Sequence, residues 1–394
     1  MAKPIDPTTA LELVLAAVPT PSVATLPAED CLGLVLAADA TAAGDLPPFD
    51  RAMMDGYAVR LADAGRSVAI LDEIAAGDGR TRPTLADGAA HPIMTGAPVP
   101  AGAEAVVPFE QSERNGDRVR LPERLRAAAN IVARGAECRA GTPWARAGQT
   151  VTPLTVAAAI GVGALQLTVH PRPHIAVLAT GSELSADPGA GCIRDSNGPM
   201  LAALLREAGL AAERLTVGDE AAALLARLRA CAGHDAIVLT GGVSAGTHDE
   251  VPGALRQLGA EVLFHSVAQK PGKPLLVARL GRQLIFALPG NPLASHLCCC
   301  RYVLPALRQL AGLPAVATSG RGVLAAPLAG NGDRIWFVPV LVHGDAVTPL
   351  PPVSSADLVQ PHQANAYLRL EPGVAAQPAG ATVAYTRIGA NAWR

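Results

Sequence analysis

The spacing of hydrophobic and polar residues separates the chain into segments of different texture. Near the start, Leu11, Val14 and Val18 recur at helical spacing. Asp6 and Pro7 precede them, and these residue types are favoured at the N-cap and in the first turn of a helix. The pattern predicts a helix that ends near Val18.

The segment that follows, to about residue 170, has short apolar runs such as SVAILDEI, AEAVVPFE and DRVRL, separated by Gly, Pro and Asp. Such runs are typical of β-strands with long connections. The same texture returns after about Thr318, in RIWFVPVLV, AYLRLEP and ATVAYTR. We therefore predict N-terminal β-rich domains and a small C-terminal β domain.

Between His174 and Gly312 two patterns alternate. The runs IAVLATG, DAIVLTGG, EVLFHSVA and QLIFALPG are strand-like, whereas PMLAALLREAGL and EAAALLARLRACAG carry leucines at helical spacing. Alternating strands and helices favour a mostly parallel sheet with helices on its faces. The chain is thus predicted to be a multidomain α/β protein with this sheet in its central domain.

Three of the predicted strands run into polar, Gly-containing turns, namely TGSEL, TGGVSAGTHD and LPGNP. The carboxyl ends of parallel strands share one edge of the sheet, and open α/β folds bind ligands there. Another polar stretch, QKPGKPLL, precedes a strand instead of following one. Its loop is therefore expected to bend over to reach the ligand edge.

In this last stretch, Lys270 and Lys273 flank Pro271 and Gly272. Proline fixes one backbone angle and glycine permits a turn that other residues resist, so the two lysines are presented from a stiff bend. One interpretation is a solvated turn, because turns collect Pro, Gly and charge. The other is a site for an anion.

Composition excludes several classes of protein. Of the 394 residues, 50% are hydrophobic and 3% aromatic, with 39 Gly and 34 Pro, which does not fit a disordered or collagenous chain. The formal net charge of -2 gives no reason to expect nucleic acid or a membrane surface as a partner. The N-terminus does not resemble a signal peptide, and the protein is expected to be cytoplasmic.

The seven cysteines and several histidines are expected to be structural. Cys298, Cys299 and Cys300 are consecutive in an apolar run, which suits neither a disulfide framework nor a zinc site. They are predicted to be small buried hydrophobic residues. We expect a turn histidine and two satisfied core histidines, at His248, His265 and His296.

Four acidic residues are expected near the ligand edge, at Glu183, Asp195, Asp219 and Asp249. Each alone fits a helix cap or a turn. Together with the two lysines they fit a magnesium site on a phosphate ester, because Mg²⁺ binds one or two carboxylates and leaves its other positions to water and substrate.

The stretch GVSAG, residues 242–246, fits the G-x-S-x-G elbow of a serine hydrolase, with Ser244 as the nucleophile. A hydrolase elbow turns at once into a helix, whereas here the next helix is expected near Pro252, with Asp249 as its cap. A Gly-rich turn after a parallel strand more often offers backbone N–H groups to an anion. We favour that interpretation for the turn at Gly242.

Six motifs occur along the chain in a family-specific order: LPPFDRAMMDGYAV, IMTGAPVPAGAEAVV, TGSEL, TGGVSAGTHD, KPGKP and LPGNP. In this order they resemble the molybdopterin molybdenumtransferase family, which includes the E domain of gephyrin. The resemblance extends from the first helix to Ala364–Leu370, which is nearly the whole chain.

The resemblance implies elongated homodimers whose subunits have four domains, the third being a molybdopterin-binding α/β domain. The expected domains are domain I at 1–24, 40–47 and 145–171, domain II at 25–39 and 48–144, domain III at 172–313, and domain IV at 318–394.

The resemblance also implies a reaction. Family members take adenylylated molybdopterin (molybdopterin-AMP) and molybdate, and they form molybdenum cofactor and AMP with the help of a divalent metal such as Mg²⁺. The implied pathway partners are the molybdopterin adenylyltransferase and apo-molybdoenzymes.

Site residues follow from the matching motifs. Those implied to be catalytic are Asp55 and Thr95, which act across the dimer interface, and Glu183, Asp219 and Asp249, which also bind the metal. Those implied to bind substrate are Lys270, Lys273 and Ser355 on molybdate, and Arg334, Ser244, Gly242 and Asn291.

The chain departs from the family pattern in the C-terminal domain. Pro339 stands where the motif Gly-Arg-x-x-Phe-x-Arg has its second arginine, and the family's Gly-Ser-Gly turn is Ser354, Ser355 and Ala356 here. An arginine elsewhere, such as Arg321 or Arg369, is a candidate to replace the missing one. These changes leave open a non-catalytic binding or scaffold protein on the same fold.

Overall fold

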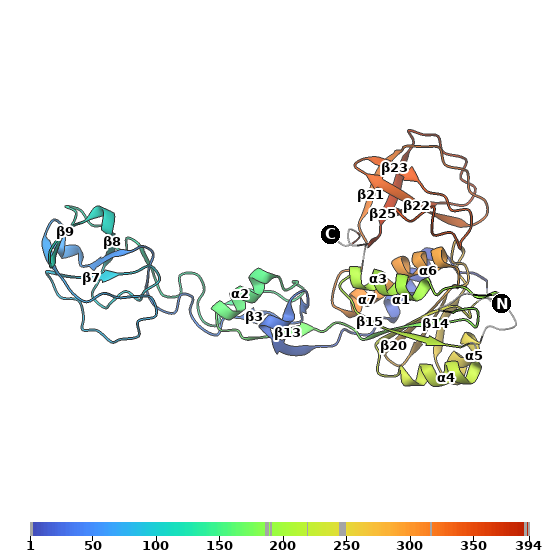
Figure 1. The fold of residues 1–394 in the computed structure, drawn as a ribbon, viewed down its shortest axis with the longest axis horizontal. Coiled ribbons are helices and arrows are strands. Elements are labelled where there is room, and N and C mark those ends of the chain that lie inside the picture. Colours follow the sequence, from blue (N-terminus) through green and yellow to red (C-terminus); the bar gives the residue numbers. More distant parts are fainter. Residues whose placement is uncertain are drawn as a thin grey trace. The chain divides into compact units, whose positions relative to one another are not determined.

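The computed structural model describes residues 3–185, 189, 191–218, 220–243, 250–315, 317–389 and 392 (Figure 1). The chain forms two compact units, one of Met1–Val23 with His170–Arg394 and one of Ala24–Val169. Each unit has hydrophobic cores of its own. Within the described residues, no helix has the length and apolar character needed to span a membrane.

A six-stranded sheet lies at the centre of the first unit, in the order β15-β14-β16-β20-β19-β17. The four strands β15, β14, β16 and β20 are parallel, as predicted. The strand bounds are β14 Ile175–Thr180, β15 Ala212–Val217, β16 Ala236–Thr240, β17 Glu261–His265, β19 Leu276–Leu280 and β20 Gln283–Leu288.

Helices cover both faces of this sheet (Figure 1). Helix α1, helix α3 and the continuous run α6-η4-α7 pack on one face, and α4 and α5 pack on the other. Their bounds are α1 Pro7–Ala17, α3 Asn197–Glu207, α4 Ala221–Ala230, α5 Val251–Gln257, α6 Pro292–Cys298, the π-helical turn η4 Cys299–Val303 and α7 Leu304–Leu310. Alternate residues of each strand enter the two cores, so Val238 points to one face and Leu239 to the other.

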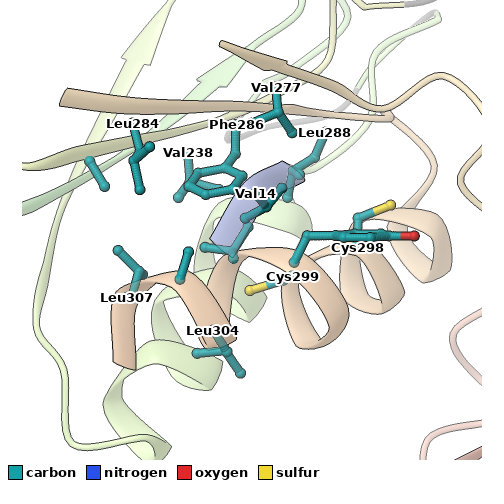
Figure 2. Packing of buried hydrophobic residues seen from close by; sticks show 14 of the residues in the cluster. Val14, Val238, Val277, Leu284, Phe286, Leu288, Cys298, Cys299, Leu304 and Leu307 are labelled. Carbon is teal, nitrogen blue, oxygen red and sulfur yellow. The ribbon is translucent and has the colours of Figure 1, made fainter. Parts of the chain in front are cut away.

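The core on the α1 side confirms two local predictions. Val14 of α1 packs with Phe286 of β20 and with Cys299 (Figure 2). The Thr8 N–H donates to the Asp6 carboxylate at 2.7 Å, so Asp6 caps α1 as expected. Cys298, Cys299 and Cys300 are all buried, and burial raises the pKa of each thiol. They act as small hydrophobic residues, which was the prediction.

The prediction that the KPGK loop (Lys270 to Lys273) bends over to reach the ligand edge is wrong. Strand β19, which follows the loop, runs antiparallel to β20, with Leu276 opposite Ala287. The start of β19 therefore lies at the carboxyl end of β20, and the loop reaches the ligand edge without bending over the sheet. The cause is the connection of only two residues, Gly281 and Arg282, because so short a loop joins antiparallel neighbours.

The N-terminal residues before α1 pair with the base of the KPGK loop. The Ile5 N–H donates to the Ser266 carbonyl at 3.1 Å, and the Ala268 N–H donates to the Ile5 carbonyl at 2.7 Å. One end of the chain thus supports a loop that lies far along the sequence.

The predicted C-terminal β domain is a small barrel. Its strands are ordered β22-β23-β21-β25-β24, and a further pairing of β22 with β24 closes the ring. A short strand, β18, adds to β22 in parallel. The bounds are β18 Gln269–Lys270, β21 Ser319–Leu324, β22 Ile335–His343, β23 Ala346–Pro349, β24 Ala366–Leu370 and β25 Thr382–Arg387.

The second unit is β-rich, as predicted, and has one helix, α2, among its described elements. It contains a three-stranded sheet β1-β13-β2, a six-stranded sheet β8-β5-β7-β6-β10-β9 and the pairs β11-β4 and β12-β3. The bounds are β1 Ala24–Pro27, β2 Val35–Leu36, β3 Ala40–Thr41, β4 Arg51–Ala52, β5 Gly56–Val59, β6 Ser67–Ile70, β7 Ala89–Ile93, β8 Ala105–Pro108, β9 Glu113–Asn115, β10 Arg118–Arg120, β11 Ile131–Val132, β12 Pro143–Ala145, β13 Gln166–His170, α2 Pro153–Gly161 and the 3₁₀ turns η1 Ala28–Cys31, η2 Leu61–Asp63 and η3 Phe109–Gln111.

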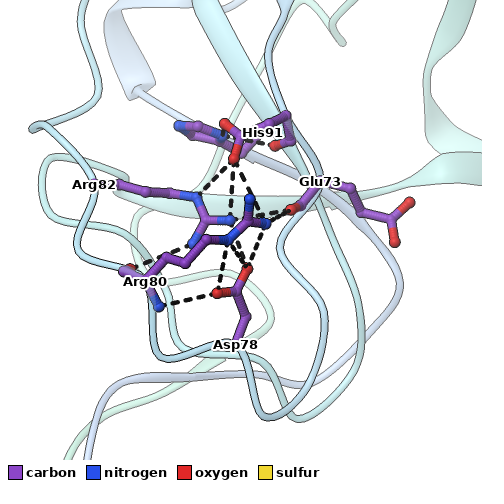
Figure 3. A network of polar contacts seen from close by, with 6 residues as sticks. Glu73, Asp78, Arg80, Arg82 and His91 are labelled. Atoms are coloured by element: carbon purple, nitrogen blue, oxygen red, sulfur yellow. Dashed lines mark hydrogen bonds and ion pairs between the residues drawn. The ribbon is translucent and has the colours of Figure 1, made fainter.

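A polar network closes the long connection between β6 and β7 in this unit (Figure 3). Arg82 contacts Asp78 at 2.6 Å and Asp72 at 3.1 Å, and Arg80 contacts Asp78 at 2.8 Å. Hydrogen bonds from Arg80 and then Arg82 hold the pKa of Asp78 well below its usual range. The network links residues along a connection that has no named strand or helix of its own.

Candidate functional site

The predicted bend lines a cavity of about 340 Å³ in the first unit. The residues around it come from the bend, from the start of α6, from the start of β22 and from the loop that follows β23. Five residues expected to bind substrate lie together here. They are Lys270, Lys273, Asn291, Arg334 and Ser355.

Backbone contacts and packing hold the bend in one shape. The Val267 N–H donates to the Lys273 carbonyl at 2.9 Å, across the base of the bend. At Gly272, φ is +89°, and a Cβ would lie 2.7 Å from Cys298 Sγ and 2.9 Å from Gln269 Nε2. Both the backbone angle and the lack of space require glycine at this position.

The first lysine of the bend lies over an aromatic ring. Strand β18 pairs with β22 so that Lys270 lies opposite Trp336, and the Lys270 ammonium is 4.5 Å from the ring centroid. An indole face attracts a cation, so the buried Trp336 holds this lysine at the cavity. The sequence reasoning missed Trp336, because pairing between segments this far apart leaves no local pattern.

A loop of the C-terminal barrel forms the opposite wall. Asn291 Nδ2 donates to Ser355 Oγ at 2.6 Å, and the Leu293 N–H donates to the Ser355 carbonyl at 3.1 Å. Within the loop, Asp357 accepts three backbone N–H groups, that of Val353 among them, and these bonds lower the pKa of Asp357. Ser355 is therefore held against the start of α6 by two contacts, and the bonds of Asp357 stabilise the loop that carries it.

The cavity is electropositive. Its lining includes Lys270, Lys273 and Arg334 and, among the described residues, no carboxylate. Asp333 lies 3.6 Å from Arg334, but its side chain is 92% exposed, and such a pair offsets little charge. Three cations with neighbouring hydroxyl and amide donors can bind a small oxyanion by charge-assisted hydrogen bonds.

The lysines carry a signal that the sequence reasoning did not use. The chain has 32 basic residues, and only Lys3, Lys270 and Lys273 among them are lysines. Two of the three therefore lie in this bend. An ammonium is a compact point charge, whereas a guanidinium is a planar fork, so the two side chains are not interchangeable around a tetrahedral anion.

A second cavity of about 410 Å³ lies at the carboxyl ends of β14, β16 and β20. Its lining includes Glu183 and Asp195, and Asn291 lines both this cavity and the first. Asn197 Nδ2 donates to Thr240 Oγ1 at 2.8 Å and to the Gly290 carbonyl at 2.7 Å, which ties the start of α3 to two strand ends.

Three predicted residues, Ser244, Asp219 and Asp249, lie outside the described residues, as does His248. Helix α5, expected near Pro252, begins at Val251. The expected cap was Asp249, but the N-cap residue is Glu250, whose side chain makes no capping hydrogen bond. Gly242 is described, with φ of +63°, but it lines neither cavity. In the part of the chain that the structure describes, no three His, Cys, Asp or Glu side chains form a metal-binding group.

The two predicted catalytic residues of the second unit contact each other. Thr95 donates its backbone N–H and its hydroxyl to Asp55 Oδ1, each at 2.7 Å. These bonds, the backbone one first, lower the pKa of Asp55. Met53 and Met54, just before Asp55, are 56% and 43% exposed. The pair is an exposed carboxylate fixed in direction and flanked by apolar side chains.

The departures from the family pattern have different places in the structure. Ser354 lines the first cavity and Ala356 the second, so both added side chains face a cavity wall. Pro339 is buried in β22 opposite Tyr367 and is not part of the described lining of the first cavity. Neither are the two arginines considered as replacements, Arg321 and Arg369.

The two histidines expected to be satisfied core residues are half-buried, and one ring nitrogen of each has a partner. His265 Nε2 lies 3.2 Å from the Val243 carbonyl, and His296 Nδ1 lies 2.8 Å from the Tyr367 hydroxyl. Burial lowers the pKa of His296 to about 4. It is therefore neutral near pH 7, as expected for a structural residue.

Three family models match the chain along its length. They are described as "MoeA N-terminal region (domain I and II)", over residues 5–163, "Probable molybdopterin binding domain", over 176–309, and "MoeA C-terminal region (domain IV)", over 321–388.

Curated relatives and solved structures agree with these models. The chain is 38% identical over 352 residues to molybdopterin molybdenumtransferase 2 of Mycobacterium tuberculosis, covering 84% of this chain and 86% of the relative. It is 35% identical over 300 residues to molybdopterin molybdenumtransferase of Staphylococcus aureus strain COL, covering 73% of this chain and 71% of the relative. A molybdopterin biosynthesis moeA protein structure from Pyrococcus horikoshii has a TM-score of 0.83 at 26% identity, covering 98% of this chain and 99% of that one.

Proposed function

Because the chain belongs to the molybdopterin molybdenumtransferase family, a family of molybdenum cofactor biosynthesis, we propose that it inserts molybdenum from molybdate into molybdopterin-AMP and releases AMP. The observation that carries this proposal is the electropositive cavity. It gathers Lys270, Lys273, Arg334 and Ser355, and it adjoins the cavity of Glu183 through the shared residue Asn291.

Molybdate is proposed to bind in the first cavity. It is a tetrahedral dianion, and the two lysines and Arg334 offset its charge in a lining without a described carboxylate. Ser355 and Asn291, already hydrogen-bonded to each other, supply further donors to its oxygens. The rigid bend keeps the two lysine backbones at a fixed separation, so little ordering is needed when the anion binds.

Molybdopterin-AMP is proposed to bind with its phosphates at the second cavity, where the parallel strands end. Glu183 and Asp195 line this cavity, and hard carboxylate oxygens suit Mg²⁺. Glu183 would hold the metal together with Asp219 and Asp249, and Ser244 and Gly242 would contact the substrate from the turn after β16. When bound, Mg²⁺ offsets charge on the phosphoanhydride.

The protein is further proposed to act as a homodimer in which Asp55 and Thr95 complete the site of the partner subunit. The exposed Met53 and Met54 beside Asp55 support this, because apolar side chains near a fixed polar group are typical of a contact surface. Adenylyltransferase and apo-molybdoenzymes are the proposed pathway partners, since the first makes the substrate and the second take up the product.

The test is insertion by purified protein supplied with molybdopterin-AMP, Mg²⁺ and molybdate, with AMP release and activation of an apo-molybdoenzyme as readouts. Lys273→Ala should raise the half-saturating molybdate concentration about tenfold or more, because it removes a charge-assisted contact. Lys3→Ala is the matched control, since it removes the one lysine outside the bend.

Two outcomes separate the alternatives. Binding of molybdopterin-AMP without release of AMP would favour the non-catalytic scaffold and reject the proposal. AMP release that is unaffected by Lys273→Ala would keep the transferase but reject the placement of molybdate at the bend.

A further inference from the structure

We propose that Gln269 and Tyr302 are positioning residues for molybdate binding. They form a buried polar support beneath the bend and fix the carbonyl of Gly272, which lies between the two lysines. This inference rests on the proposed function, because it assumes that molybdate binds at the bend.

The contacts of Gln269 define the orientation of its side-chain amide. The Tyr302 hydroxyl donates to Gln269 Oε1 at 2.6 Å, and Gln269 Nε2 lies 3.4 Å from the Gly272 carbonyl and 3.6 Å from Cys298 Sγ. The Gly272 carbonyl can only accept a hydrogen bond, so the NH₂ group of Gln269 must face the bend, and its oxygen then accepts from the Tyr302 hydroxyl. The Tyr302 hydroxyl thus supports the orientation in which Gly272 receives a donor.

The support is fully buried. Gln269, Tyr302 and Cys298 each have 0% exposure, so water cannot replace a missing partner. A buried amide that loses one partner turns to satisfy the rest of its groups, because an unsatisfied buried polar atom is costly. Loss of the Tyr302 hydroxyl should thus free the Gln269 amide to turn away from Gly272.

An irregularity of the helix places Tyr302 at this point. Tyr302 lies in the π-helical turn η4, between α6 and α7. Pro305 follows at the second position of α7, and it has no N–H to give to the Arg301 carbonyl four residues earlier. A π-helical turn shifts the side chains after it around the helix axis, and such turns often occur at functional sites.

The bend is anchored on both sides of Gly272. Lys270 is held by the pairing of β18 with β22, and Lys273 is held by the bond from the Val267 N–H to its carbonyl. The Gln269 amide contacts the middle of the bend, between these two anchors. The separation of the two lysines therefore depends on this contact as well as on the two anchors.

The experiment compares Tyr302→Phe and Gln269→Met with the wild type and with Tyr367→Phe. Tyr367→Phe is a matched control, because Tyr367 is also buried and its substitution also removes one hydroxyl hydrogen bond. That bond goes to His296, and neither residue lines this cavity. The first readout is insertion, with kcat and the half-saturating molybdate concentration measured separately. The second is protection of Lys270 and Lys273 by molybdate against acetylation, measured by mass spectrometry with Lys3 as the internal reference.

We expect Tyr302→Phe and Gln269→Met to raise the half-saturating molybdate concentration about five- to tenfold, with kcat within about twofold of wild type. Protection of the two lysines should need correspondingly more molybdate, while Tyr367→Phe should match the wild type in both readouts. The positioning role is wrong, and the proposed function stands, if Tyr302→Phe gives the same results as Tyr367→Phe while the wild type inserts molybdenum. In that case molybdate must also protect Lys270 and Lys273 of the wild type against acetylation. If the wild type shows neither AMP release nor protection, both proposals are wrong.

Discussion

The tight packing under the bend predicts that Gly272→Ala is far more harmful than the same change at another glycine with positive φ. A Cβ at Gly272 would meet Cys298 Sγ at 2.7 Å and Gln269 Nε2 at 2.9 Å. Both neighbours are fully buried, so neither side chain can move aside into bulk solvent. Gly281, in the turn between β19 and β20, has φ of +58° and no atom within 4 Å of its Cβ position.

The two substitutions separate backbone strain from packing. At Gly281 only the left-handed backbone resists alanine, which costs about 1–2 kcal/mol. At Gly272 the same strain is joined by overpacking, which adds about 1–3 kcal/mol. We therefore expect Gly272→Ala to lower the free energy of unfolding by about 2–5 kcal/mol, and Gly281→Ala by about 1–2 kcal/mol.

The assay is urea unfolding of both variants and of Gly272→Ala combined with Cys298→Ala. The double variant lacks the sulfur that the new methyl group meets. Its loss in free energy of unfolding should therefore be smaller than the sum of the losses in the two single variants. Equal losses at Gly272 and Gly281, or strictly additive losses in the double variant, would refute the packing argument.

Three further predictions concern charge. Thr95→Val removes the hydroxyl bond to Asp55, so the pKa of Asp55 should rise toward its ordinary value in an NMR titration, and an unchanged pKa would reject the bond. In the wild type, the Asp55 carboxylate stabilises the fold at pH values above its ordinary pKa, and this contribution is lost as the pH falls through its lowered pKa. Pro339→Arg should lower the melting temperature, because position 339 is buried. It should not reduce the half-saturating molybdate concentration, because position 339 is not part of the described lining of the first cavity, and a lower half-saturating concentration would contradict this placement. Burial lowers the pKa of His296 to about 4 from 6.5, so as the pH falls the unfolded chain takes up the proton before the folded protein does. The free energy of unfolding should therefore keep its full His296 contribution above about pH 6.5 and decrease toward pH 4. Unfolding measured against pH should show a smaller decrease in His296→Gln than in the wild type.

Local signals in the sequence were sufficient for the elements that form locally. Helix α1 follows from Asp6, Pro7 and its apolar spacing, and the parallel strands follow from buried runs that end in glycine turns. The resemblance to the family picked out the residues that meet at the first cavity, Lys270, Lys273 and Asn291 through KPGKP and LPGNP, and Arg334 and Ser355 through the C-terminal pattern. That these residues lie together at one cavity could be seen only in the folded structure.

Contacts between distant segments could not be read in the same way. The direction of β19 depends on the two-residue turn Gly281–Arg282, a hairpin signal that was present and was not used. The pairing that places Trp336 under Lys270 has no sequence signal, because β18 has only two residues and lies far from β22 in the sequence. The same holds for the bond between Tyr302 and Gln269, which depends on a π-helical turn.

The position of α1 has a consequence for the order in which the protein can fold. Val14 and Ala10 of α1 are buried against strands that begin only after His170, while residues 24–169 form a separate compact unit. During synthesis on the ribosome, the first helix emerges with its apolar face uncovered and must wait until the whole second unit and most of the central sheet have followed. Ile5 can pair with the base of the bend only when Ser266 and Ala268 have been made. The anion site thus needs Ile5 together with Ser355, which is made much later, so a ribosome that stalls between them leaves the site incomplete.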